Sequence, residues 1–383
     1  MIHRSITREL LTQLQEYPIV TVIGPRQAGK TTLVRNVLPD YSYASLENPD
    51  NRQLATDDPK AFLKRYPGKT IFDEVQRTPH LLSYLQGIVD EEGINGRYVL
   101  TGSHQLELRA AISQSLAGRT AILHLLPFSI GELQDANIVF ADFESYIIQG
   151  FLPRIYDQNQ RPSVAYANYY QTYVEKDVRQ LTQLKEVSLF EKFIKLLAGR
   201  VGQIINYHSL SNDVGVGAKT IKQWLSILEA SFVIFKLPPY YENFGKRVIK
   251  SPKYYFTEIG LLAYLLGVEK NYQVSRDPLV GNMFENLVVL EALKNRYNQG
   301  RNAELYFFRD SNGNEIDLLC KTGDGLIGVE IKSASTWNSS FSKGLTNFSQ
   351  SNEKLSRSIV VYSGESIDLS SGVEVRSFQD FMW

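Results

Sequence analysis

Short apolar runs alternate with amphipathic stretches over the first 150 residues of the chain. The strand-like runs are Ile19–Ile23, Ser42–Leu46, Thr70–Phe72, Tyr98–Leu100 and Ala121–Leu126. Strands that alternate with helices are typical of a parallel sheet covered by helices. The pattern therefore predicts an α/β domain over residues 1–165.

A helical pattern follows. Tyr166, Tyr169, Tyr170 and Tyr173 have the spacing of one helix face, which favours a packed core stripe over an aromatic site for a base or cofactor. Further along, helices flank a glycine turn at 215–217 and precede a strand-like run that ends before Pro238-Pro239. This order of elements predicts a winged-helix domain over residues 166–240.

Nucleic-acid binding by this middle part stays open. The outward positions of its third helix are Lys219, Thr220, Lys222, Gln223 and Ser226. Two lysines favour packing against a domain or subunit over DNA binding, because binding to DNA needs several phosphate contacts. The basic, aromatic segment 241–254 suits a nucleic-acid strand and suits equally a linker with solvated lysines.

Residues 255–383 are expected to form a separate α/β domain. Two helical stretches precede strand-like runs at Leu305–Phe308, Ile316–Cys320 and Leu326–Ile331, and a fourth run follows at Ser358–Tyr362. Glycine- and asparagine-rich segments between the first three runs predict hairpin turns.

Composition narrows the classes of function. The 383 residues carry 41 basic and 41 acidic side chains, so any site for a polyanion must be a local patch. The single cysteine, Cys320, excludes a disulfide framework and a cysteine-rich zinc site. No signal peptide or long apolar segment is evident, so a soluble, cytoplasmic protein with no membrane contact is expected.

A phosphate-binding loop is the clearest chemical signal. The sequence Gly-Pro-Arg-Gln-Ala-Gly-Lys-Thr lies between a predicted strand and a predicted helix, where such a loop wraps nucleotide phosphates with backbone N–H groups. Lys30 is expected to reach the phosphates and Thr31 to hold Mg²⁺. The expected nucleotide-binding residues are Gly24, Pro25, Arg26, Gln27, Ala28, Gly29, Lys30, Thr31 and Thr32.

Two further strand ends fit ATP hydrolysis. Thr70–Phe72 runs into Asp73 and Glu74, which would hold Mg²⁺ and polarise the attacking water, respectively. The next strand ends in small hydroxyl residues, of which Ser103 is the preferred γ-phosphate sensor and Thr101 the second choice. The cofactors expected are thus ATP and Mg²⁺.

These motifs, with Phe-Asp-Glu-Val-Gln, Leu-Thr-Gly-Ser and Leu-Ala-Gly-Arg in order, resemble the AAA-type P-loop ATP-binding proteins of bacteria and archaea. Those proteins carry a C-terminal domain of uncharacterised function, and the similarity covers essentially the whole chain. The resemblance implies an arginine that completes the γ-phosphate site, often from a neighbouring subunit. Arg119 is the candidate, in cis or in trans, with a structural salt bridge as the alternative. A homo-oligomer formed through the ATPase domain would follow from the trans arrangement.

A second candidate site lies on the predicted C-terminal hairpin. Strand alternation puts Glu330 and Lys332 on one face, and Asp317 on the adjacent strand could meet them. Two carboxylates that hold Mg²⁺ and a lysine suit a metal-dependent phosphodiesterase. The array resembles the restriction-endonuclease-like PD-(D/E)XK superfamily, and Glu285 matches the extra acid of many members.

The sequence therefore favours an AAA-type ATPase that couples nucleotide turnover to a nuclease-like domain acting on nucleic acid, with DNA as the candidate partner. The alternative is a regulatory ATP switch whose C-terminal domain binds protein or DNA without cleaving it. The two hypotheses differ in whether Asp317, Glu330 and Lys332 meet around a metal-sized gap or pair with other side chains.

Overall fold

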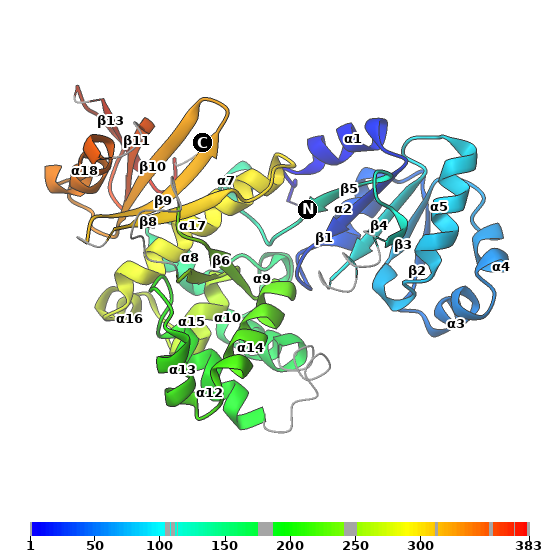
Figure 1. Ribbon diagram of the computed structural model, residues 1–383, viewed down its shortest axis with the longest axis horizontal. Coiled ribbons are helices and arrows are strands. Elements are labelled where there is room, and N and C mark those ends of the chain that lie inside the picture. Colours follow the sequence, from blue (N-terminus) through cyan, green and yellow to red (C-terminus); the bar gives the residue numbers. More distant parts are fainter. Residues whose placement is uncertain are drawn as a thin grey trace.

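The computed structural model describes residues 2–103, 108, 112, 114–174, 187–240, 251–310, 313–351, 355–370 and 372–380. Three regions follow one another along the chain, and Figure 1 shows the N-terminal region on one side of the other two. Within the described parts, no helix combines the length and the apolar character needed to cross a membrane.

The N-terminal region contains the predicted parallel sheet. Its strands lie in the order β2-β3-β4-β1-β5, and every neighbouring pair is parallel. The strands are β1 (Ile19–Ile23), β2 (Ser42–Ser45), β3 (Thr70–Asp73), β4 (Tyr98–Gly102) and β5 (Thr120–His124). The helices are α1 (Thr7–Glu16), α2 (Lys30–Val37), α3 (Pro49–Asp57), α4 (Pro59–Lys64) and α5 (Leu81–Glu92). The strands β1, β4 and β3 are neighbours and run parallel, so their carboxyl ends lie at the same end of the sheet. The phosphate loop after β1, the two acids at the end of β3 and the hydroxyl residues at the end of β4 therefore lie close together.

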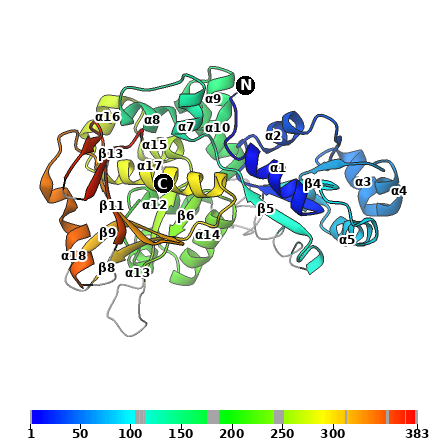
Figure 2. The same cartoon turned by 90° about the horizontal axis from the view of Figure 1, so that it is seen from above.

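Helices connect this sheet to the middle region. They are α7 (Ile130–Asp135), α8 (Phe143–Gln149), α9 (Pro153–Asp157), α10 (Pro162–Tyr169) and a π-helical turn at Tyr170–Val174. All four tyrosines of the predicted stripe are buried, which confirms their core role. Figure 2, seen from above, shows these connecting helices beside the ends of α1 and α2.

The middle region packs three helices against a small antiparallel sheet. The elements are α12 (Val187–Ala198), α13 (Tyr207–Val214), α14 (Ala218–Ala230), β6 (Ile234–Leu237) and β7 (Lys253–Phe256). The predicted inward residues of α14 are buried, among them Ile221, Trp224 and Leu228. The expected linker 241–254 includes two residues that belong to a strand: Lys253 and Tyr254 are buried in β7. Residues 241–250 lie outside the described residues.

The C-terminal region has a mixed sheet in the order β12-β13-β11-β10-β9-β8. The strands are β8 (Leu305–Arg309), β9 (Glu315–Thr322), β10 (Gly325–Lys332), β11 (Leu355–Tyr362), β12 (Ile367–Asp368) and β13 (Val373–Ser377). The helices are α15 (Ile259–Leu266), α16 (Asn271–Arg276), α17 (Val280–Asn298) and α18 (Lys343–Ser351). The β8–β9 and β9–β10 pairs are the predicted hairpins.

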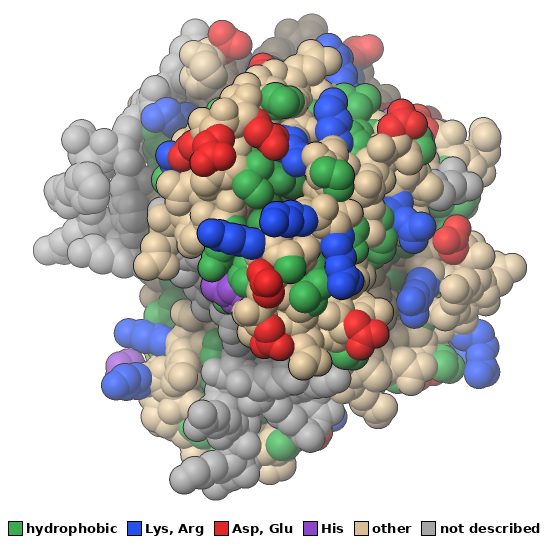
Figure 3. All heavy atoms as spheres, turned by 90° about the vertical axis from the view of Figure 1, so that its right-hand side faces the viewer, with side chains coloured by type: hydrophobic (Ala, Val, Ile, Leu, Met, Phe, Trp, Pro, Cys, Tyr) green, Lys and Arg blue, Asp and Glu red, His purple; other side chains and the backbone are tan. Residues whose placement is uncertain are grey.

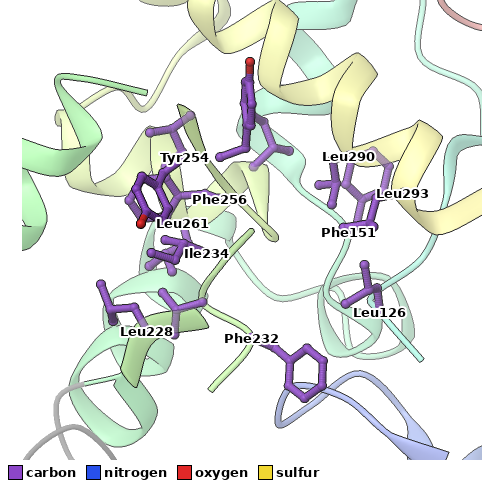
Figure 4. Packing of buried hydrophobic residues seen from close by; sticks show 14 of the residues in the cluster. Leu126, Phe151, Leu228, Phe232, Ile234, Tyr254, Phe256, Leu261, Leu290 and Leu293 are labelled. Atoms are coloured by element: carbon purple, nitrogen blue, oxygen red, sulfur yellow. The ribbon is translucent and has the colours of Figure 1, made fainter. Parts of the chain in front are cut away.

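One buried hydrophobic cluster runs through all three regions. Leu126 follows the N-terminal sheet, Leu228 and Phe232 come from the middle region, and Leu290 and Leu293 come from α17. Figure 4 shows Leu126, Leu290 and Leu293 around Phe151 on one side of the junction, and Leu228 on the side of Ile234 and Phe256. The three regions therefore share apolar packing instead of being joined by exposed linkers alone.

Candidate functional site

The phosphate loop has the backbone geometry that its motif predicts. Gly24 packs so closely that an added Cβ would lie 2.0 Å from the Leu125 carbonyl oxygen. Gly29 precedes α2 with a φ of 90°, a left-handed conformation that favours glycine. Lys30 is buried, and its Nζ donates to the carbonyl oxygens of Gly24 at 2.9 Å and Pro25 at 2.8 Å. Burial lowers the pKa of Lys30, while Glu74 and Asp73 act in the opposite direction.

Asp73 is the centre of a hydroxyl cluster at the end of β3. Thr31 Oγ1 donates to its Oδ1 at 3.0 Å, and the hydroxyl of Tyr43 donates to its Oδ2 at 2.8 Å. Thr101 Oγ1 also donates to this carboxylate. Thr31 and Asp73 thus lie together as a Mg²⁺ site requires, although they are 42 residues apart in the chain.

Glu74 has a φ of 58°, a left-handed backbone conformation that is uncommon for residues other than glycine. Ser103 Oγ donates to Glu74 Oε2 at 3.0 Å, and Gln76 Nε2 donates to the same carboxylate. Gln76 also donates to Ser103 Oγ at 3.1 Å. The predicted sensor and the predicted base are therefore in direct contact, whereas the second choice, Thr101, contacts Asp73.

Arg119 does not reach the phosphate loop of its own chain. Its guanidinium donates to both carboxylate oxygens of Asp90, at 2.6 and 2.8 Å. The Arg119 carbonyl accepts from Ile19, the first residue of β1, whereas the loop follows the last residue of that strand. A five-residue strand separates the two positions by about 16 Å at roughly 3.3 Å a residue. Of the two arrangements left open for Arg119, this geometry therefore disfavours the one in cis, and the role itself stays a prediction.

Sequence reasoning missed three residues of this site: Arg4, Tyr43 and Gln76. Tyr43 lies within a predicted strand and Gln76 ends the Phe-Asp-Glu-Val-Gln motif, but neither was given a role. Arg4 carries no local signal, because its partners are 24 to 128 residues away.

The outer face of the N-terminal region carries charges of both signs. Figure 3 shows lysine and arginine side chains interspersed with aspartate and glutamate over the described part of this face. The distribution of charge on this face therefore gives no reason to expect that it attracts a polyanion.

In the C-terminal region, the structure brings Asp317, Glu330 and Lys332 together. Lys332 Nζ lies 3.1 Å from Asp317 Oδ2 and 2.6 Å from Glu330 Oε2. The register that pairs Val329 with Leu318 places Glu330 opposite Asp317 on the neighbouring strand. Burial and the nearby Asp317 raise the pKa of Glu330 to about 8. Burial opposes the shift at Asp317, but Lys332 and Lys253 hold its pKa below its usual range.

Glu285 is engaged differently from the prediction. Its Oε1 lies 3.0 Å from Lys253 Nζ and accepts from the Tyr255 hydroxyl at 2.5 Å. Lys253 Nζ also lies 2.9 Å from Glu315 Oε1. Among the described residues, no three histidine, cysteine, aspartate or glutamate side chains group in a way that could hold a metal ion. The extra acid is thus neutralised by a lysine that sequence reasoning assigned to a linker.

Family models match three successive parts of the chain. An AAA domain matches residues 16–134, and two domains of unknown function match residues 140–272 (DUF8612) and 280–379 (DUF4143). The first match confirms the expected AAA-type ATPase domain. The expected domain boundaries at 165, 240 and 254 stay predictions.

Relatives along the whole chain are uncharacterised. A Mycobacterium tuberculosis protein is 31% identical over 367 residues, which cover 94% of this chain and 80% of that protein, and a Mycobacterium bovis protein gives the same values. A Haemophilus influenzae protein is 24% identical and covers 86% of both chains. Among solved structures, a Walker-type ATPase of Pyrococcus abyssi is 14% identical, with a TM-score of 0.47, 69% of this chain covered and 96% of that one. AMPPCP-bound DnaA from Aquifex aeolicus is 13% identical, with a TM-score of 0.29 and coverage of 59% and 86%.

Proposed function

Because the chain belongs to the family of these mycobacterial proteins and its residues 16–134 match an AAA domain, we propose that it hydrolyses ATP with Mg²⁺. One observation carries the proposal: Lys30, Thr31, Asp73 and Glu74 meet at one edge of the parallel sheet. A P-loop enzyme needs a phosphate cradle, a metal ligand and a base at such an edge.

The phosphate loop supports the binding step. Lys30 Nζ is held by two loop carbonyl groups, so a nucleotide phosphate would replace these contacts with an ionic one. The N–H groups at the start of α2 would donate to the same phosphates. Thr31 and Asp73 would hold Mg²⁺, which when bound neutralises charge on the phosphate oxygens.

Glu74 is proposed as the general base. Ser103 and Gln76 fix its carboxylate, and Glu74 N–H donates to Thr101 Oγ1 at 3.2 Å, which links the base to the hydroxyl cluster around Asp73. Because Ser103 and Gln76 both donate to Oε2, Oε1 is the carboxylate oxygen that would accept a proton from the attacking water.

For Arg119, only the role in trans remains as a proposal. The side chain is about one-third exposed, so a neighbouring subunit could accept it after the Asp90 pair opens. A homo-oligomer through the ATPase domain is proposed on the same ground.

We propose metal-dependent cleavage of a nucleic-acid phosphodiester as the activity of the C-terminal region. The supporting observation is that Asp317 and Glu330 lie opposite each other with Lys332 between them. Two carboxylates this close are stabilised by a cation, and Mg²⁺ prefers oxygen ligands. Lys332 would then orient water or stabilise developing charge. The middle region, proposed as a winged helix, presents exposed Lys219 and Lys222 on α14 for contact with DNA.

A regulatory switch without cleavage is the competing proposal. It is favoured by the pairing of the C-terminal acids with Lys332 and Lys253, which stabilises the site without any metal. ATPase and DNA-cleavage assays on one preparation, with and without Mg²⁺ or Mn²⁺, test both functions. ATP turnover without cleavage under any of these conditions would favour the switch.

A further inference from the structure

Lys253 is a charged residue of the middle region that lies within the C-terminal site. It belongs to β7, its side chain is 4% exposed, and its Nζ contacts Glu285 on α17 and Glu315 on β9 at 3.0 and 2.9 Å. Its Nζ also lies over the Phe307 ring, 5.3 Å from the ring centroid. Although burial opposes the shift, Tyr255 and Glu285 keep the pKa of Lys253 above its ordinary value. The ammonium group is therefore a fixed positive charge among carboxylates.

The backbone of the middle region reaches the same place. Ile204 forms an antiparallel bridge with Lys253, and Asn282 Nδ2 at the start of α17 donates to the Val201 carbonyl at 3.0 Å. A cleft of about 500 Å³ opens here. Its lining residues are Gly202, Gln203, Ile204 and Lys253 from the middle region, and Asn282, Glu285, Arg309, Glu315 and Asp317 from the C-terminal region.

We infer that the two domains of unknown function build one site together, which holds a single divalent cation at Asp317 and Glu330, with Lys253 in place of a second cation. This inference rests on the proposed metal-dependent function. Lys253 lies within the match to the first domain (140–272), and its carboxylate partners lie within the match to the second (280–379).

The charge balance of the cleft gives the physical reason. Glu285, Glu315 and Asp317 line one cleft, and uncompensated carboxylates in a buried position repel each other strongly. A second divalent cation would relieve this repulsion, but the ammonium group of Lys253 does so already. Arg309, 42% exposed and 3.4 Å from Glu315, adds a cation at the opening, where a phosphate group of a bound strand could meet it.

The test counts Mn²⁺ ions bound by the full chain, by calorimetry and by the electron paramagnetic resonance of free Mn²⁺. Wild-type protein should bind one ion in the C-terminal site, counted in a Lys30→Ala, Asp73→Asn background that lacks the nucleotide site. Lys253→Met in the same background should bind two, since three carboxylates then share the cleft. Lys321→Met, on an exposed position of β9, is the matched control and should bind one.

A second variant keeps the test valid if Lys253→Met folds poorly. Lys253→Met with Glu285→Gln removes the whole ion pair, which proteins tolerate better than one lone buried charge. It should fold and bind one ion. One ion of unchanged affinity in Lys253→Met would overturn the role of Lys253, with the metal site intact. No ion in wild type but one in Lys253→Met would support Lys253 as the substitute cation and overturn metal-dependent cleavage instead. No ion in any variant would overturn both.

Discussion

The guanidinium of Arg4 donates from Nη1 to the carbonyl oxygen of Ala28, in the middle of the phosphate loop, at 2.7 Å. Its Nη2 donates to the Leu126 carbonyl at 2.6 Å, and its Nε lies 3.1 Å from Glu132 Oε1. Glu132 also closes the capping box of α7, the first helix after the sheet. One buried side chain thus ties the loop, the last strand and the connecting helices together.

Arg4→Gln should weaken ATP binding and lower stability, because it leaves Glu132 buried without its cation. Breaking a buried pair costs about 3–5 kcal/mol. Nucleotide titration and denaturant unfolding measure the two effects. Arg8→Gln, at an exposed position of α1, should change stability by no more than about 0.5 kcal/mol. Equal effects of the two substitutions would contradict the role of Arg4.

Local patterns predicted the elements around each site better than the contacts between distant elements. The run that ends in Asp73 and the loop at Lys30 were identifiable because each motif is continuous in the sequence. Lys253 was assigned to a basic linker for the opposite reason. Its partners Glu285 and Glu315 are 32 and 62 residues away, so the sequence showed only the neighbouring lysines and tyrosines. A buried cation is recognisable only when its counter-ions are placed, and tertiary packing places them.

Arg119 shows a similar limit. The Gly-Arg motif identified the residue. Its distance from the loop, however, follows from two facts of the fold: Arg119 directly precedes β5, and β5 lies parallel beside β1. In a parallel sheet the two ends of a strand face opposite edges. The motif alone could not distinguish a role in cis from one in trans.

Lys30→Ala should abolish tight ATP binding, whereas Glu74→Gln should bind ATP and fail to hydrolyse it. The lysine compensates phosphate charge, and the glutamate accepts the proton of the attacking water. Equilibrium binding and phosphate release should be measured separately for each variant. Hydrolysis at the wild-type rate by Glu74→Gln would show that another group is the base.

If Arg119 acts in trans, turnover per subunit should rise with protein concentration. Arg119→Ala protein mixed with Lys30→Ala protein should then regain part of the activity, because one supplies the intact loop and the other the arginine. Asp90→Asn is the informative companion: it frees Arg119 from its partner and should not reduce activity. A mixture as inactive as its components would leave Arg119 a structural residue.

Glu258 should make stability fall as pH rises. Its Oε1 accepts from Phe151 N–H, Gly260 N–H and the Tyr166 hydroxyl, and burial raises its pKa above the ordinary 4.5. The folded state therefore keeps a proton that the unfolded state has lost, so stability decreases from about pH 4.5 upward until the folded carboxyl ionises. Thermal unfolding across pH 4.5–8 should show a shallower decline for Glu258→Gln. The exposed Glu269→Gln should follow the wild-type curve.

The C-terminal acids provide the test of cleavage. Asp317→Ala should lose metal binding and any nicking of DNA, whereas Lys332→Ala should lose nicking and retain the metal. ATP hydrolysis should persist in both, because the phosphate loop and these acids lie in different regions of the chain. If the three residues are instead only a salt-bridge cluster, each substitution should lower the melting temperature and leave DNA and metal behaviour unchanged. These measurements require the full chain, because a fragment that begins at residue 255 would lack Lys253 and leave Glu285 and Glu315 without their common cation.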